Sequence, residues 1–122
     1  MEKVGGEGAV SLTEDEWALL DQNADDWYGL WEVDWWFNGV YPDWPFDRRA
    51  EFVSSLVRRG LMEVFYGRLG LERPPLETKA ADAALAVPVN WKARSDIEEP
   101  VYHISTSEAG RAALKTIGEQ AT

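Results

Sequence analysis

The chain has 122 residues, of which 45% are hydrophobic and 28% charged, and its formal net charge is −10. This length and composition predict one folded domain, and the absence of cysteine excludes disulfides, thiolate catalysis and cysteine-ligated metal sites. Residues 1–47 contain 12 of the 22 acidic groups and a single basic one, Lys3, whereas the remainder is nearly neutral. A field of that sign repels phosphate backbones and favours basic partners.

The N-terminus is expected to be a flexible tail, residues 1–10, ahead of a single domain over residues 11–118. The tail is glycine-rich and polar, and it lacks the apolar core of a signal peptide. No segment reaches the roughly 20 apolar residues of a membrane span. We therefore expect a cytoplasmic protein without membrane contact.

The first helix is predicted from Thr13 to about Gln22. Thr13 and Glu16 have the spacing of a capping box, in which each side chain accepts the other residue's backbone N–H. Leu12 before the cap and Trp17 in the first turn fit a hydrophobic staple.

A second helix is predicted over residues 25–40, where Gly39 and the Tyr41-Pro42 step end it. At 100° per residue its apolar side chains fall into two stripes. The stripe expected in the core consists of Leu30, Val33, Phe37 and Val40. The other is a ladder of indoles at four-residue spacing, formed by Trp27, Trp31 and Trp35, with Asp34 between the two stripes.

A third helix is predicted from Trp44 to Arg59, followed by a left-handed Gly60 and a strand from Met62 to Tyr66. Its buried stripe is expected to consist of Phe46, Ala50, Val53 and Val57, widened by Phe52 and Leu56. Its exposed face is expected to carry Asp47, Arg48, Glu51, Ser54, Ser55 and Arg58.

The long segment 68–100 is an insert that should hold an element of its own. Thr78–Leu85 has the composition of a short helix, and Trp91 is its predicted anchor onto the domain. A strand over residues 101–104 and a closing helix over residues 107–117 complete the chain.

Two short motifs resemble the winged helix-turn-helix superfamily, in particular its bacterial regulators. One is a helix end followed by a strand, LVRRGL at residues 56–61, and the other is SEAG at residues 107–110. The resemblance implies an α+β, mainly α, winged-helix-like domain with three N-terminal helices, a two-stranded wing interrupted by the insert, and a closing C-terminal helix. It also implies that the third helix enters the DNA major groove.

Two functions remain open, and both describe a binding protein rather than an enzyme. Tryptophan commonly anchors interfaces, so the first hypothesis is a regulatory or adaptor domain that binds a second copy or a basic protein through Trp27, Trp31, Asp34 and Trp35. The alternative is a DNA-binding transcriptional regulator with Arg48 and Arg58 in the groove and Lys92 and Arg94 on phosphates. The pI near 4.5 disfavours this alternative.

Two further hypotheses concern a small-molecule site and the single histidine. Trp31, Asp34 and Trp35 could hold an organic cation, because indole faces beside a carboxylate attract positive charge. His103 is the only histidine, and it is expected to face solvent or to lie at a sheet edge. No catalytic, cofactor or metal motif accompanies it, so neither an enzyme activity nor a cofactor is expected.

Overall fold

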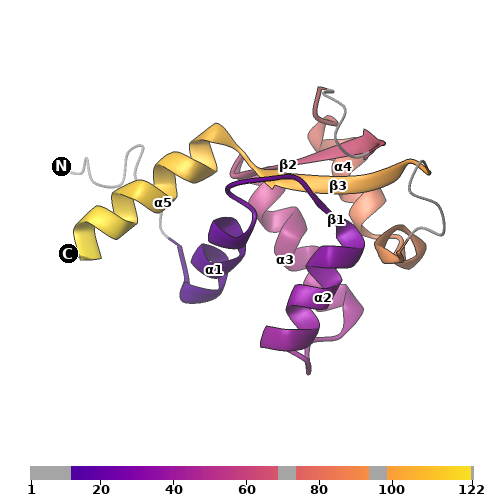
Figure 1. Cartoon of the computed structure of the whole chain (residues 1–122), viewed down its shortest axis with the longest axis horizontal. Coiled ribbons are helices and arrows are strands. Elements are labelled where there is room, and N and C mark those ends of the chain that lie inside the picture. The colour runs from indigo at the N-terminus through magenta and orange to yellow at the C-terminus, as the bar shows by residue number, and fades with distance from the viewer. Residues whose placement is uncertain (1–11, 69–73, 94–98, 122) are drawn as a thin grey trace.

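The computed structural model describes residues 12–68, 74–93 and 99–121, with side chains as far as residue 116. Over these ranges the chain is α+β and mainly α, as predicted (Figure 1). The elements in chain order are α1 (Glu14–Gln22), β1 (Tyr28–Gly29), α2 (Leu30–Val40), α3 (Phe46–Arg58), β2 (Met62–Gly67), α4 (Thr78–Leu85), the 3-10 turn η1 (Pro88–Trp91), β3 (Val101–Thr106) and α5 (Glu108–Ala121). The predicted tail, residues 1–10, lies outside the described residues.

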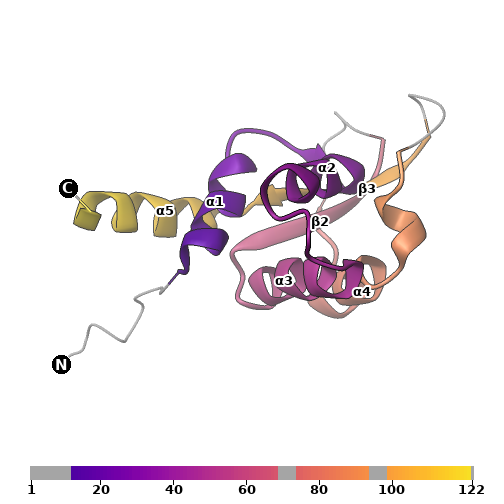
Figure 2. The same ribbon diagram turned by 90° about the horizontal axis from the view of Figure 1, so that it is seen from below.

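The three strands form one antiparallel sheet in the order β1-β3-β2, so β3 lies in the middle. Tyr28 on β1 and Val64 on β2 both pair with Ile104 on β3. Directly opposed residues share a face of the sheet, so these three side chains point the same way. That is the side on which α1, α2 and α3 lie (Figures 1 and 2). We call the other side the outer face of the sheet.

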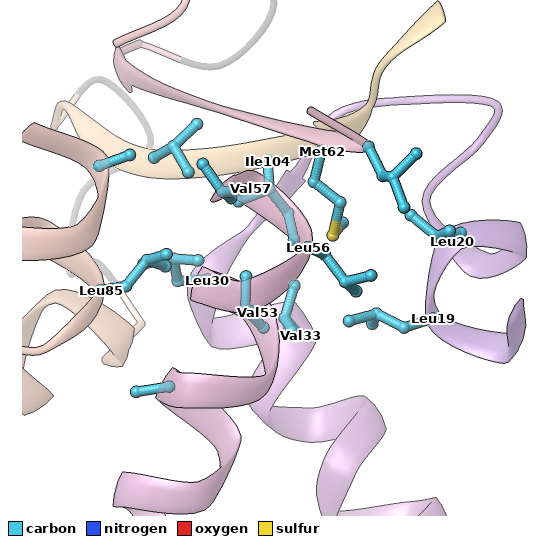
Figure 3. Packing of buried hydrophobic residues seen from close by; sticks show 14 of the residues in the cluster. Leu19, Leu20, Leu30, Val33, Val53, Leu56, Val57, Met62, Leu85 and Ile104 are labelled. Carbon is cyan, nitrogen blue, oxygen red and sulfur yellow. The ribbon is translucent and has the colours of Figure 1, made fainter. Parts of the chain in front are cut away.

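The core fills the space between the sheet and these helices, as Figure 3 shows. Apart from alanine, its apolar residues with no exposed surface come from both layers: Leu19, Leu20, Leu30, Phe37, Val53, Leu56, Val64, Leu85 and Ile104. Each such side chain contributes about 1.5–3 kcal/mol relative to an exposed one. Leu85 belongs to α4, so the insert supplies part of the core.

Two local sequence patterns are confirmed in detail. At the start of α1, Thr13 Oγ1 accepts the backbone N–H of Glu16 at 3.1 Å, and Glu16 Oε1 accepts that of Thr13 at 3.0 Å. After α3, Gly60 has φ = 77°, the left-handed conformation that lets the chain turn directly into β2.

The predicted second helix begins later than expected. Its first turns are replaced by the strand β1, which pairs with β3, so Trp27 precedes the strand and is not helical. The backbone N–H of Gly29 donates to Glu32 Oε1 at 2.9 Å, which caps the helix that starts at Leu30. The prediction for Val40 was wrong, because it lies in the last helical turn and is 47% exposed.

The expected exposed face of α3 is also partly covered. α4 packs against α3, and Ser54, predicted to face solvent, is buried. The helix in the insert falls where it was predicted, over Thr78–Leu85. Trp91 is buried and its indole donates to the carbonyl of Leu85 at 2.9 Å, which confirms its role as an anchor.

The C-terminal elements are longer than predicted. β3 extends to Thr106 and α5 from Glu108 to Ala121, with the Ser107 hydroxyl accepting the N–H of Gly110 at 3.0 Å. The expectation for His103 was wrong, because the residue sits in the central strand and is 1% exposed. Among the described helices, none combines the length and apolar character that a membrane crossing requires.

Candidate functional site

The outer face of the sheet carries a packed group of aromatic rings. Phe65 on β2 pairs with His103 on β3, and their rings stack at 5.5 Å with an interplanar angle of 14°. Trp27 covers both, with ring centroids 5.9 Å from Phe65 and 6.1 Å from His103. Trp27 therefore lies over the sheet and not on the helix where the sequence pattern placed it.

Trp31 lies beside this group although it belongs to α2. A Cβ atom at Gly29 would lie 2.7 Å from Trp31 Nε1, and Gly29 pairs with His103. The indole therefore occupies the space at Gly29 on the outer face of the sheet, where any larger residue would displace it. Its Nε1 is buried and has no acceptor among the described residues.

Trp35 continues the row one turn further along α2. Its ring meets Trp31 edge to face, with centroids 5.4 Å apart and planes at 72°. Trp35 is 70% exposed, the highest value among the large hydrophobic side chains of the described residues. We call Trp27, Trp31 and Trp35 the aromatic face; its members are those of the predicted ladder, but they come from two elements instead of one helix.

Asp34 is engaged elsewhere. Its Oδ1 accepts a hydrogen bond from Arg49 Nη1 at 2.8 Å, and the same nitrogen donates to Asn38 Oδ1 at 2.8 Å. Arg49 also donates through Nε to the carbonyl of Trp44 at 2.9 Å. The proposed cation site at Trp31, Asp34 and Trp35 therefore lacks a free carboxylate.

Sequence reasoning missed Arg49, which is only 6% exposed. A signal was present, because at 100° per residue Arg49 falls between Val53 and Leu56, inside the buried stripe of α3. A charged residue in such a stripe needs a partner of opposite charge, and Asp34 is that partner.

Arg48, the first candidate for a DNA contact, lies against the turn between α2 and α3. Its guanidinium is 3.8 Å from the centroid of the Trp44 ring, on which Tyr41 also stacks at 4.7 Å. The Tyr41 hydroxyl donates to Asp15 on α1, and this hydrogen bond is the main cause that raises the pKa of Tyr41 to about 12. Arg48 is thus an exposed residue with an aromatic contact of its own.

Arg58, the second candidate, is held by two carboxylates. It pairs with Glu51 on the same helix and with Asp82 on α4 at 3.4 Å. The hydrogen bond to Glu51 is the largest cause that raises the pKa of Arg58, and Asp82 adds to it. The hollow beside Arg58, about 220 Å³, is lined by Asp47 together with both of these acids. This surface of α3 is acidic.

One of the two candidates in the insert, Lys92, belongs to the part of the chain that the structure describes. Lys92 is exposed and lines a shallow hollow of about 460 Å³ with Tyr66 and Tyr102, whose rings lie 4.5 Å apart. Arg94 lies outside the described residues. The structure therefore does not bring Lys92 together with Arg48 or Arg58 in any described hollow.

The aromatic face ends at a hollow of about 260 Å³ beside Trp27. Asp25, Asp26, Ser105 and Arg111 also line it. Asp26 Oδ1 accepts the backbone N–H of Trp27 at 2.7 Å, and an Arg111 guanidinium nitrogen donates to the carbonyl of Thr106 at 2.7 Å. Sequence reasoning did not single out this hollow, because β1 and β3 bring its two sides together.

No group of three or more histidine, cysteine or carboxylate residues in the described ranges has the arrangement of a metal site. Comparison with protein-family models, with curated proteins and with solved structures yields no match to this chain. The features that bear on its function are the aromatic face and the arginines.

Proposed function

We propose that this chain is a non-enzymatic binding domain, with a regulatory or adaptor role, that acts through protein–protein contacts on the aromatic face. One observation carries the proposal: the indole of Trp35 is 70% exposed and lies edge-on to Trp31. Exposing such a large apolar ring to water is unfavourable, and tryptophans of this kind are the usual energetic centres of interfaces.

The packing beneath the face supports the same role. Trp31 is fixed against Gly29, and Trp27 against the stacked rings of Phe65 and His103. A partner would thus meet a pre-arranged surface, so little ordering of these side chains would oppose binding.

The alternative is a DNA-binding regulator of winged-helix type. The order of the helices α1, α2 and α3, the strand β2, the insert, the strand β3 and the helix α5 is the one that the resemblance implies, except that the unpredicted strand β1 lies between α1 and α2. The charges disfavour it, because Arg58 is paired with two carboxylates, and Arg48 lies on Trp44 and lines a hollow together with Asp15, Glu16 and Glu51. We therefore rank this alternative second.

Peptide display tests the proposal. A random peptide library is selected on the whole chain, and the affinities of the enriched peptides are then measured for three proteins: wild type, Trp35→Ala and Tyr66→Ala. Tyr66 is a matched control, because it is exposed but belongs to the hollow at Lys92. We expect Trp35→Ala to weaken binding about 30-fold or more, which is the hot-spot range, and Tyr66→Ala to leave it unchanged.

Two results would decide against the proposal. Enriched peptides that bind Trp35→Ala as tightly as wild type would remove the aromatic face as the binding surface. Salt-dependent binding of duplex DNA that is lost in Arg48→Ala and Arg58→Ala would establish the alternative instead.

A further inference from the structure

We infer that the partner of the aromatic face is a protein segment that carries arginine or lysine, and that its cation enters the hollow beside Trp27. This inference rests on the proposed function and specifies its partner. It starts from the position of the hollow, which shares Trp27 with the aromatic face and is bordered by Asp25 and Asp26.

The chemistry of the hollow suits one cationic side chain. An indole face attracts an ammonium or guanidinium group, and exposed carboxylates beside it can accept its N–H bonds. Asp25 and Asp26 are both exposed, whereas Asp34, the carboxylate predicted for a cation, is occupied by Arg49. At about 260 Å³ the hollow is smaller than the roughly 300–1,000 Å³ of pockets that enclose drug-sized ligands.

The charge of the surrounding chain points to the same partner. Residues 12–47, which provide α1, β1, α2 and the aromatic face, contain ten acidic residues and no lysine or arginine. A second copy would bring an equally acidic surface against this one, so like charges would oppose self-association. A basic segment would instead be attracted, with its apolar side chains against Trp31 and Trp35.

One positive group also borders the hollow. Arg111 lines it, with one guanidinium nitrogen donating to the carbonyl of Thr106. Its charge opposes an incoming cation, so removing this charge should affect the affinity in the opposite sense to removing a carboxylate. We expect Arg111→Gln to strengthen the binding of a basic segment.

Two labelled peptides distinguish the contribution of charge to binding from that of shape. One is a ten-residue alternation of leucine and arginine, and its twin has citrulline, the neutral isostere, at every arginine. Anisotropy with the whole chain should show about tenfold or tighter binding of the arginine peptide, and added salt should narrow this difference. Trp35→Ala should weaken both peptides.

The double variant Asp25→Asn, Asp26→Asn should remove most of the preference for arginine. Asparagine keeps an oxygen that can accept the N–H of Trp27, so the change removes charge but not the local hydrogen bond. Asp43→Asn is the matched control, because Asp43 is exposed and does not line the hollow.

The outcomes separate the inference from the proposed function. Equal binding of both peptides with loss in Trp35→Ala would overturn the inference and leave the function standing. The inference would also fail if Asp43→Asn reduced the preference as much as the double variant, or if the chain formed a dimer that Trp35→Ala dissolves. If Trp35→Ala changes the affinity of neither peptide, the aromatic face and the inference fail together.

Discussion

Replacing Arg49 with methionine should destabilise the domain more than the replacement of an exposed charged residue does. Methionine retains much of the buried alkyl volume but loses the bonds to Asp34, Asn38 and the Trp44 carbonyl, at 2.8, 2.8 and 2.9 Å. Removing one partner of a buried ion pair costs about 3–5 kcal/mol. Because the Asp34 side chain is 36% exposed, water solvates part of the abandoned carboxylate, and we expect a loss of about 3 kcal/mol.

Arg48→Met provides the matched control one residue away. Its guanidinium lies on the Trp44 ring at the surface, and an exposed contact of this kind contributes about 0.5–1 kcal/mol. Urea unfolding followed by circular dichroism is the appropriate assay, because urea is uncharged and does not screen ion pairs as the denaturant guanidinium chloride does. Equal losses in the two variants would refute the reasoning. Adding Asp34→Asn to Arg49→Met should cost less than the sum of the single changes.

Three other substitutions test the junction between α5 and the sheet and the contact of α1 with the turn between α2 and α3. Gly110→Ala should lose about 2 kcal/mol or more in thermal unfolding, because its Cβ would lie 2.2 Å from the Leu61 carbonyl oxygen; an unchanged melting temperature would contradict this close approach. Ser107→Ala should lose about 1–2 kcal/mol in urea, since the hydroxyl caps α5 and donates to the Gly60 carbonyl at 2.6 Å; Thr116→Ala, on the exposed surface of α5, is the control. The raised pKa of Tyr41 favours the folded state below pH 10, and this contribution disappears as the pH rises toward 12. The stability of Tyr41→Phe should therefore fall less over this alkaline range than that of the wild type. An identical fall in stability in both proteins would count against the bond to Asp15.

Sequence patterns located the elements that depend on neighbouring residues. The capping box at Thr13, the left-handed Gly60 and the alanine-rich helix α4 are set within a few residues, and each was predicted at its observed position. The burial of Trp91 was predicted for a different reason, because a large indole after a short helix is expected to pack against the domain and anchor the insert there.

Elements that depend on distant residues were not predicted. β1 has two residues, and it is a strand only because β3 lies beside it; Tyr28 pairs with Ile104, which is 76 positions further along the chain. Its formation removes the first turns of the expected helix and carries Trp27 from α2 to the sheet. For the same reason His103, which local alternation could not place, is buried in the central strand.

The central position of β3 has a consequence for the synthesis of the chain. The Thr106 hydroxyl donates to the Leu20 carbonyl at 2.7 Å, and its N–H donates to the Asn23 carbonyl at 3.1 Å, so the end of α1 is held by a residue that is synthesised 86 positions after Leu20. Until then the leucines and tryptophans of residues 12–47 have no completed sheet to cover them. The ten acidic residues of this segment, unopposed by lysine or arginine, would keep neighbouring nascent chains apart during that interval.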